Sequence, residues 1–283
     1  MTRFAESSST PVYRPLRVYA LVVTISVVLI THNEEANLPH TLQSVMPLVS
    51  DGKGEIVIVD SGSTDRTRKI ADSFGVKWFS EPWKGFAAQK NSALAKASGD
   101  WVLQLDADEA LEPELATEIV ALMTQPPAVQ GFWVPRMNLF LGRWIKHGGY
   151  YPDPKLRLIR RGAGHFEEYG AHPTIKISGS TLRCSHSLVH NAYPTLLAYI
   201  DHMNSYSSMG AEFAASQGWR GFSVVDIVVR PALTFVYNYF FRLGFLDGRE
   251  GLLLHLYHSA YVSWKYAKAW ELSRAREERA KKR

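Results

Sequence analysis

Residues 101–109 read WVLQLDADE, an apolar run that passes directly into acidic residues. The run 101–105 predicts a buried strand. Residues two apart on an extended segment point to the same side, so Asp106 and Asp108 can converge on one cation. Two carboxylates with open positions suit Mg²⁺ or Mn²⁺, which keep sites for phosphate oxygens. The alternative is a solvated acidic turn, which does not explain the place of the motif directly after an apolar strand.

The chain around this motif alternates between strand-like and helix-like segments. We expect strands at 25–30, 55–60 and 76–79, and helices from Asp65 to about Gly75, over 84–98, and from Glu112-Pro113 to about Thr124. Alternation at these lengths predicts βαβ units and a parallel sheet, so the fold class is α/β with a Rossmann-like sheet. Ligands of such sheets bind at the carboxyl ends of the strands. Polar clusters fall at three of these ends, Thr31–Glu35, Asp60–Asp65 and Asp106–Glu109.

The cluster after the second strand reads DSGSTD, residues 60–65. Asp60 ends a buried strand, where its carboxylate can accept hydrogen bonds from a base N–H or a ribose hydroxyl. Turn and capping chemistry is the alternative, and it accounts for Asp65 but leaves Asp60 without a role. The loop 31–35 faces the same sheet edge, and there His32 either stacks on a base or simply lines the loop.

Composition excludes several classes of protein. The chain has 283 residues and a mass of 31.9 kDa, with 46% apolar and 21% charged residues, so it is neither disordered nor fibrous. The mean hydropathy of −0.14 argues against a protein with many membrane spans. The single cysteine, Cys184, excludes an internal disulfide framework and a Cys-rich zinc site, and it fits a reducing, cytoplasmic compartment.

The net charge of +5 belongs to one end of the chain. Residues 264–283 carry eight basic and three acidic residues, and the rest of the chain is neutral. A nucleic-acid-binding protein usually has a basic face on its folded part, so nucleic acid is not an expected partner. A basic segment beside apolar sequence suits an anionic membrane surface. A solvated terminal helix is the alternative.

The second half of the chain changes pattern at Gly131. Short strands and turns are expected to about Ala192, and a helix over 195–217. Residues 222–246 are apolar but interrupted by charged residues and a proline, which predicts an interfacial helix pair rather than a spanning helix. We therefore expect an N-terminal arm at 1–23, a catalytic domain at 24–192, and a helical extension with a basic tail at 193–283. Contact with the inner face of the plasma membrane is expected, and oligomerisation is left open.

Three segments together resemble the family 2 inverting glycosyltransferases of GT-A fold. They read ISVVLITHNEE from Ile25, EIVIVDSGSTD from Glu55, and KNSALAKASGDWVLQLDADE from Lys90. A weaker likeness continues through HGGYYPDPKLRLIRRG and FFRLGFLDGREG, and it is similar to the branch of lipopolysaccharide-core β-glycosyltransferases. The resemblance implies metal-dependent transfer of a sugar from a nucleotide-sugar donor, with UDP favoured, to a hydroxyl of a bacterial surface glycan or lipid-linked acceptor.

The resemblance also implies residue roles. The donor's base and ribose would be held by Thr31, His32, Asn33, Glu34, Asp60 and Ser61. Many members have an aromatic residue where His32 stands and an acid where Ser61 stands. Asp106 and Asp108 would hold ribose, metal and diphosphate, and Lys90 would lie near the phosphates. Arg157 would contact phosphate or acceptor, and His190 is either a further metal ligand or a structural histidine.

The general base is the least defined part of the implied site. Related enzymes carry a His-Glu pair in the region where His172 is followed by Pro173 here. We expect Glu168 to act as the base, with Asp108 as the other catalytic carboxylate. The competitors for the base are Glu167, Asp153 and Glu109, and a solvated loop is the alternative role for Glu167 and Glu168.

Other classes of protein fit the sequence less well. A nucleotidyltransferase would normally carry a Gly-rich basic loop after the first strand, where this chain has THNEEAN. A nicotinamide-dependent oxidoreductase would carry G-x-G-x-x-G after a strand, and this chain has none. A non-catalytic binding or scaffolding protein that keeps the fold stays open because of Pro173. Turnover of a nucleotide sugar would separate it from an enzyme.

Overall fold

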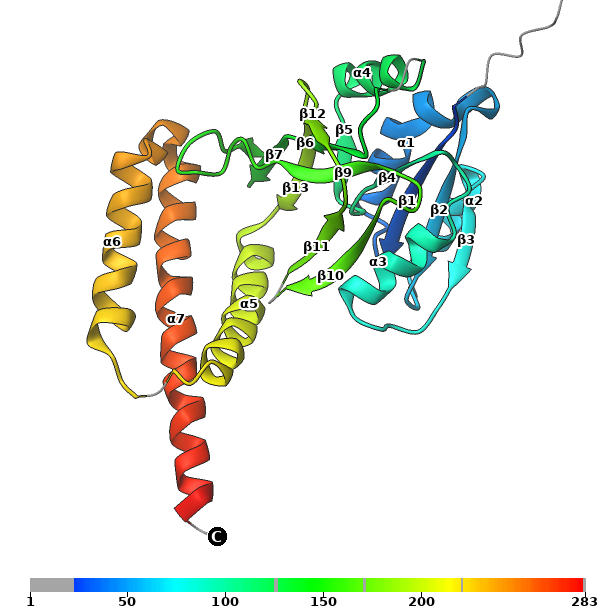
Figure 1. Cartoon of the computed structure of the whole chain (residues 1–283). Coiled ribbons are helices and arrows are strands. Elements are labelled where there is room, and N and C mark those ends of the chain that lie inside the picture. Colours follow the sequence, from blue (N-terminus) through cyan, green and yellow to red (C-terminus); the bar gives the residue numbers. More distant parts are fainter. Residues whose placement is uncertain (1–22, 125–126, 170–171, 220, 282–283) are drawn as a thin grey trace, which may run out of the picture.

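The computed structural model describes residues 23–124, 127–169, 172–219 and 221–281. Of the predicted N-terminal arm, 1–23, all but the last residue lies outside these ranges. A seven-stranded sheet forms the centre of the first part of the chain (Figure 1). Its strand order is β12-β6-β9-β4-β1-β2-β3. The bounds are β1 (Ile25–Thr31), β2 (Gly54–Asp60), β3 (Lys77–Ser80), β4 (Trp101–Gln104), β6 (Gly131–Val134), β9 (Lys155–Arg160) and β12 (Thr181–Arg183).

The first four strands are parallel, as the sequence predicts. Apolar side chains of β1 and β2 are buried on both faces of the sheet, which explains their unbroken apolar runs. One face packs against α1 (Leu38–Val49), α2 (Thr67–Ser73) and α4 (Pro113–Thr124), and the other against α3 (Phe86–Ala95). A short 3₁₀ turn, Ser50–Gly52, joins α1 to β2. Helix α1 was not expected from the sequence, and α3 is two to three residues shorter at each end than the expected helix over 84–98.

Two smaller sheets pack beside the central sheet. One has the order β5-β13-β7-β8, formed by β5 (Glu109–Leu111), β13 (Leu188–Tyr193), β7 (Arg136–Phe140) and β8 (Arg143–Trp144). The other is the hairpin of β10 (Gly164–Tyr169) and β11 (His172–Ile177). Because β5 follows the acidic motif directly, this second sheet fixes where the motif leaves β4.

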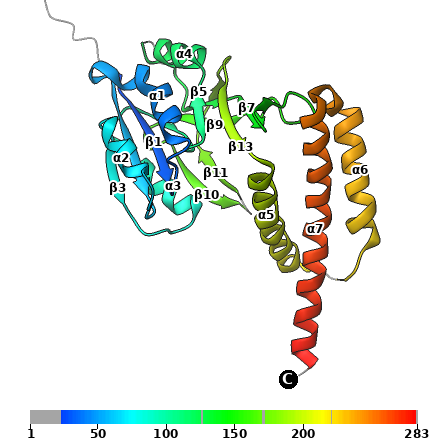
Figure 2. The same cartoon turned by 180° about the vertical axis from the view of Figure 1, so that it is seen from behind.

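The C-terminal part is helical and stands beside the sheets (Figures 1 and 2). It begins with α5 (Leu196–Ser216). A helical run then extends through the π-helical turn Val225–Val229, α6 (Arg230–Val236) and the π-helical turn Tyr237–Phe241. A 3₁₀ turn, Gly244–Asp247, leads into the long α7 (Gly248–Lys281). In both views α7 lies between α5 and α6. No helix among the described residues is long and apolar enough to cross a membrane.

The expectation of a helix pair within 222–246 is wrong in one respect. The stretch forms a single helical run over 225–241, and its partner is α7. Pro231 is accommodated because it follows a π-helical turn, where the N–H of Arg230 donates to the carbonyl of Val225 five residues back. The missing N–H of the proline therefore falls where the hydrogen bonding changes from the π-helical to the α-helical pattern.

The basic tail is part of α7, and its first half is packed. Lys268 Nζ donates to the carbonyl of Asn204 at 2.9 Å and to the hydroxyl of Ser207 at 2.7 Å, both in α5. Ala269 and Ser273 on the same face are buried. Residues 264–273 thus belong to the helical core, and the tail is free to meet other partners only beyond Ser273.

Candidate active site

A cavity of about 1070 Å³ opens at the carboxyl ends of the parallel strands. Its walls bring together the three polar clusters that the sequence analysis placed at this edge. The predicted site residues in its lining are Thr31, His32, Glu34, Ser61, Lys90, Asp106, Asp108, Arg157 and His190. The hairpin β10–β11 and aromatic side chains close the opposite side, with Trp83, Phe86, Phe166, Tyr193 and Tyr206 among them. The position of the cavity agrees with the rule for ligands of parallel sheets.

Asp106 lies between two cations. Lys90 Nζ donates to its Oδ1 at 2.5 Å, and Arg157 Nη2 donates to its Oδ2 at 2.7 Å. Burial raises the pKa of Asp106, but the charges of Arg157 and Lys90 outweigh burial and hold that pKa well below its usual range. Asp106 is therefore ionised, and it fixes both cations at the floor of the cavity.

The extended backbone expected over the acidic motif is wrong. β4 ends at Gln104, and the chain turns, with the N–H of Glu109 donating to the carbonyl of Asp106 at 3.0 Å. Asp106 and Asp108 consequently have different partners, although the charge of Asp106 still raises the pKa of Asp108. The turn arises because Glu109 begins β5, which must cross to the second sheet.

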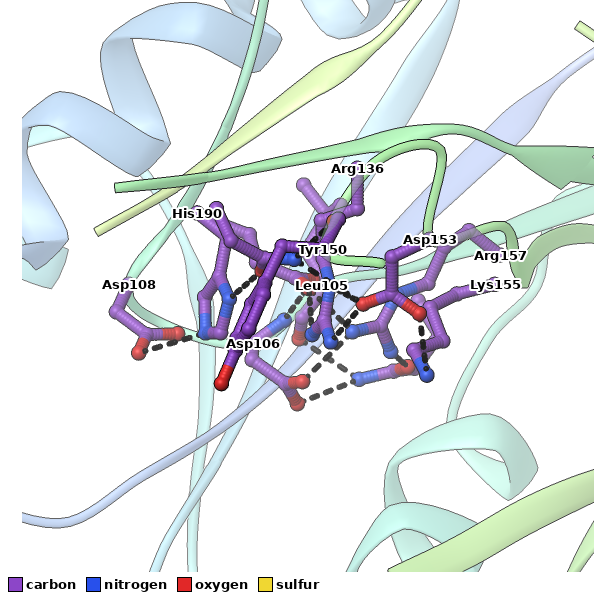
Figure 3. Close-up of polar contacts among 12 residues, drawn as sticks. Leu105, Asp106, Asp108, Arg136, Tyr150, Asp153, Lys155, Arg157 and His190 are labelled. Carbon is purple, nitrogen blue, oxygen red and sulfur yellow. Dashed lines mark hydrogen bonds and ion pairs between the residues drawn. The ribbon is translucent and has the colours of Figure 1, made fainter. Parts of the chain in front are cut away.

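A buried ion network lies beneath Asp106 (Figure 3). Glu109 is fully buried, and its Oε1 accepts from Arg157 Nη2 at 2.5 Å and from Arg136 Nη1 at 3.2 Å. Burial lowers the pKa of Arg157, but Asp106 and Glu109 raise it by more, so the guanidinium stays charged. Glu109 is thereby tied to two arginines below the cavity. It is poorly placed to take a proton from a substrate.

Asp108 faces His190, which comes from β13 (Figure 3). Their closest atoms, Asp108 Oδ2 and His190 Nε2, are 3.3 Å apart. His190 Nδ1 lies 2.7 Å from Asn138 Oδ1, while the amide nitrogen of Asn138 donates to the carbonyl of Tyr150 at 3.2 Å. The amide orientation therefore makes Nδ1 the protonated nitrogen, so Nε2 is the nitrogen directed at Asp108. Burial raises the pKa of Asp108, and the hydrogen bond and charge of a His190 that carries both protons more than offset this effect.

Asp60 organises the loops that follow β1 and β2. It is buried, and it pairs in register with Thr31, whose hydroxyl donates to Asp60 Oδ1 at 2.8 Å. The N–H groups of Gly62 and Ser63 donate to Oδ2 at 2.9 and 2.8 Å. Gly62 has φ +96°, a conformation that glycine adopts without strain. Asp60 thus makes the turn that supports the cavity wall, and it is not itself among the lining residues. Its contact with a base stays a prediction.

The loop after β1 is held against this turn. Asn33 has φ +56°, its N–H donates to Ser63 Oγ at 2.8 Å, and its Oδ1 accepts from the N–H of Thr64 at 2.8 Å. Asn33 thus supports the loop, whereas His32, Glu34 and Ser61 reach the cavity wall. Burial raises the pKa of Glu34, and the carboxylates of Asp108 and Asp106 add to the shift. The expected cap at Asp65 is displaced, because the N-cap of α2 is Arg66, which makes no side-chain cap bond; Asp65 Oδ1 instead accepts from the N–H of Thr67 at 2.9 Å, just ahead of the helix.

The candidate general bases differ in the side chains with which they pair. Glu167 pairs with Lys176 at 2.8 Å, and its side chain is 42% exposed. Asp153 pairs with Arg136 at 2.6 Å; burial raises its pKa, but Arg136 and Lys155 bring that pKa to about 2. Glu168 lies in β10 with its backbone opposite Pro173, and its side chain lies outside the described residues. Glu168 therefore stays a prediction.

Some residues of the site were not foreseen from the sequence. Arg136 contributes to the ion network from 27 positions beyond Glu109, and Asn138 sets the tautomer of His190. Both alternate with buried residues in a short strand, a pattern that indicates a half-buried strand but no partner. Gln104 alone carried a signal, as a polar residue inside a buried run, and its side chain contacts Arg157.

Comparison with known proteins decides the family. The family model described as Glycosyl transferase family 2 matches residues 26–176, which extend from β1 to β11. The chain belongs to this family. It is a glycosyltransferase with an α/β fold, which confirms the fold class and the resemblance inferred from the three segments.

Individual relatives of the glycosyltransferase are more distant. The "Lipopolysaccharide core biosynthesis glycosyltransferase LpsC" of Rhizobium meliloti is 29% identical over 259 residues, covering 87% of this chain and 92% of that protein. Glucosyl-3-phosphoglycerate synthase of Mycobacterium tuberculosis, solved with Mn²⁺ and UDP-glucose, is 31% identical over 41% of this chain and 44% of its own, with a TM-score of 0.35. TarS of S. aureus, solved with UDP, is 16% identical over 87% and 90% of the two chains, with a TM-score of 0.47.

Proposed function

We propose that this glycosyltransferase moves a sugar from a nucleotide-sugar donor, with UDP as the nucleotide, to a hydroxyl of a bacterial surface glycan or its lipid-linked precursor. The reaction inverts the anomeric carbon and uses Mg²⁺ or Mn²⁺. The observation that carries the proposal is the Asp108–His190 pair beside two cationic side chains in one cavity. The likeness to LpsC, which extends over most of both chains, supports a lipopolysaccharide-type acceptor.

The chemistry of Asp108 and His190 fits a divalent cation. Because Asn138 holds the proton on His190 Nδ1, neutral His190 would direct a lone pair from Nε2 at the Asp108 carboxylate, 3.3 Å away. Two electron-pair donors facing each other at this distance repel unless a proton or a metal ion lies with them. An imidazole held by an outer hydrogen bond and a carboxylate are ordinary ligands of Mn²⁺. Among the described residues, no third acidic or histidine ligand joins them, which leaves positions for phosphate oxygens.

A cation bound there would stabilise the negative charge that grows on the departing nucleoside diphosphate. Lys90 and Arg157 already stand at the cavity floor, held by Asp106. They would contact the diphosphate as fixed positive groups without reorganising during the reaction. On the donor side, Thr31, His32, Asn33, Glu34, Asp60 and Ser61 would enclose the base and ribose.

The transfer step itself needs a proton acceptor. The acceptor oxygen forms a bond to the anomeric carbon from the face opposite the diphosphate, and the carbon–oxygen bond to the diphosphate breaks. The hydroxyl proton passes to a carboxylate, for which we propose Glu168. A general base of this kind contributes roughly 10²–10⁴-fold to the rate.

A screen of nucleotide sugars tests the proposed function. The full chain is incubated with UDP-, GDP- and dTDP-linked sugars with Mn²⁺, with Mg²⁺ and with EDTA, and nucleoside diphosphate release is measured. We expect release from a UDP-sugar with either metal and none with EDTA. Release that persists in EDTA would show that the reaction does not need a metal ion. Release only from a GDP- or dTDP-linked sugar would show that UDP is not the nucleotide. A chain that turns over no nucleotide sugar would refute the proposed reaction.

The helical extension supports peripheral contact with the cytoplasmic face of a membrane. The run 225–241 leaves an apolar face uncovered by α7, with Val225, Val228, Leu233, Tyr237, Phe240 and Phe241 all more than half exposed. Arg230 and Arg242 flank this face and are exposed, whereas Asp226 is largely covered and paired with Arg230. An apolar face with basic flanks suits the headgroup region of an anionic bilayer.

Flotation with vesicles tests the membrane contact. Removing residues 264–283 would also remove packed residues of α7, so point substitutions are preferable. Phe241→Ser and the pair Arg274→Glu with Arg276→Glu should weaken binding to phosphatidylglycerol vesicles, the second in a salt-sensitive way. Leu197→Ser, at an equally exposed leucine on α5, is the matched control. Unchanged flotation of Phe241→Ser would show that this apolar face does not bind the membrane. A dimer in solution that Phe241→Ser dissociates would show that the face binds a second copy of the chain instead.

A further inference from the structure

A second, smaller cavity adjoins the candidate metal site. Its volume is about 270 Å³, and it shares Arg136, His190 and Tyr193 with the large cavity. Its other walls come from β7, from the loop between β8 and β9, and from α7. The loops after β1 and β2 line the large cavity but not this chamber, so an occupant of the chamber would not contact them. We propose that this chamber binds a sugar ring of the acceptor.

The lining of the chamber has the chemistry that a sugar ring requires. Tyr150 and Tyr193 line it with partly exposed aromatic rings, and the buried side chains of Phe140 and Leu254 form the apolar wall behind them. Among the described residues, the hydroxyls of Tyr150 and Tyr193 have no hydrogen-bond partner. Sugars present alternating C–H faces and hydroxyls, so unpaired phenol groups on aromatic rings match both parts of such a ligand.

The charges of the chamber are already neutralised. Asp153 Oδ2 accepts from Arg136 Nη2 at 2.6 Å, and its Oδ1 lies 2.9 Å from Lys155 Nζ. Arg136 in turn reaches Glu109. No isolated charge is left to demand a phosphate or carboxylate, so a neutral sugar ring fits better than an anionic group.

Tyr150 links the chamber to the reacting centre. In Figure 3 its hydroxyl points the same way as the carboxylate of Asp106. Its carbonyl accepts from Asn138, whose Oδ1 faces His190. A ring bound against Tyr150 would therefore present a hydroxyl toward the side of the site where the donor sugar meets the metal ligands.

The helical extension shapes this chamber. The N–H of His147 donates to Asp247 Oδ2 at 2.8 Å, and the N–H of Gly148 donates to the carbonyl of Arg242 at 2.8 Å. A Cβ on Gly149 would lie 2.2 Å from the Arg242 guanidinium, so the loop packs directly on the extension. Residues beyond 193 thus position Tyr150, and Leu254 adds part of the wall.

The test rests on the proposed function and uses the UDP-sugar found in the screen. Nucleotide release is measured alone and with two probes, methyl hexopyranosides and delipidated lipopolysaccharide core oligosaccharide. We expect a probe to accelerate release in the parent enzyme. Tyr150→Phe, which removes one hydroxyl, should raise the KM for the probe about tenfold and leave the KM for the donor within about twofold.

Leu254→Phe fills the chamber and should reduce probe-dependent release at least tenfold, while Leu256→Phe, on the exposed face of α7, should not. Thermal unfolding of each variant separates a blocked chamber from a misfolded one, and Tyr150→Phe keeps the test valid if Leu254→Phe is unstable. The proposal that the chamber binds an acceptor sugar would be refuted by any of three results. These are an unchanged KM for the probe in Tyr150→Phe, equal effects of Tyr150→Phe on the KM values for donor and probe, and no acceleration of release by either probe. Failure of the parent to turn over any donor would instead refute the proposed function.

Discussion

The two edges of the parallel sheet carry carboxylates in opposite settings. At the amino edge, Glu55 Oε1 accepts from Ser26 Oγ at 2.7 Å and from the N–H of Ser98 at 2.7 Å, and Lys77 pairs with the other oxygen. Asp100 accepts from the N–H and the hydroxyl of Thr24 at the same edge. These carboxylates join neighbouring strands and loops, and their hydrogen-bonding capacity is largely used within the chain.

At the carboxyl edge, Glu34, Asp106 and Asp108 lie close enough for their charges to interact. Burial raises the pKa of Glu34, and Asp108 and Asp106 raise it further. At the amino edge, burial also raises the pKa of Glu55, but the hydrogen bonds from Lys77, Ser26 and Ser98 bring it to about 2. The comparison shows that acidic residues at the end of a strand do not by themselves make a site. A site arises where the fold brings several carboxylates close together, as it does with Glu34, Asp106 and Asp108, so that cations must balance their charge.

Asp108→Ala should produce the largest effect at the carboxyl edge. It removes one of the two proposed metal ligands, so metal-dependent release of nucleoside diphosphate should fall below detection, with the thermal unfolding midpoint little changed. Asp100→Asn, at the amino edge, is the matched control and should keep full turnover. Near-normal turnover by Asp108→Ala would show that the metal binds elsewhere. Equal losses of turnover in both variants would show that the two edges do not differ in function.

Glu168→Gln should depress the rate by about 10²–10⁴-fold while the donor KM stays close to that of the parent, because a base acts on the acceptor proton. Glu167→Gln is the control, since Glu167 already pairs with Lys176 and His165. The rates are measured with saturating donor and acceptor probe. A loss in Glu167→Gln with none in Glu168→Gln would move the base one position along β10.

The sequence was sufficient for the parts of the site that follow strands. Apolar runs located β1, β2 and β4, and the rule for parallel sheets then brought Thr31, Asp60 and Asp106 to one edge before any contact was known. Lys90 and Arg157 joined them through the family resemblance. The structure confirms that these residues share one cavity or its supporting turn.

Long-range pairing explains what the sequence left out. The extended conformation expected for 106–108 failed because β5 pairs with β13, whose residues lie nearly 80 positions later. Arg136 and Asn138 gain their roles only when β7 joins the same sheet. A period of two along a short strand indicates which side is buried, but it carries no information on the partner across the sheet. Side-chain networks formed by such partners therefore appear only in the folded chain.

Glu55→Gln tests whether the carboxylate at the amino edge stabilises the fold. The folded state lowers the pKa of Glu55 to about 2, so its ionised form contributes stability above the unfolded pKa of about 4.5, and this contribution is lost as the pH falls toward 2. We expect the substitution to lower the free energy of unfolding by about 1–3 kcal/mol at pH 7, a typical value for hydrogen bonds to a charged group. Urea unfolding at pH 7 and pH 3 measures the difference, which should shrink at the lower pH. A loss independent of pH would mean that the charge is not what stabilises this edge.

Glu34→Gln should have the smallest effect and the opposite sign. The folded state raises the pKa of Glu34, so the ionised carboxylate costs stability above that raised pKa, and the cost disappears below the unfolded pKa. The variant should therefore be slightly more stable than the parent at pH 8 and equal to it at pH 4, measured by urea unfolding in EDTA. Mn²⁺ should reverse the gain, because a cation beside Asp108 favours the ionised form of a neighbouring carboxylate. If Glu34→Gln instead lost stability at pH 8 as Glu55→Gln does at pH 7, the crowding of negative charge at the carboxyl edge would be disproved.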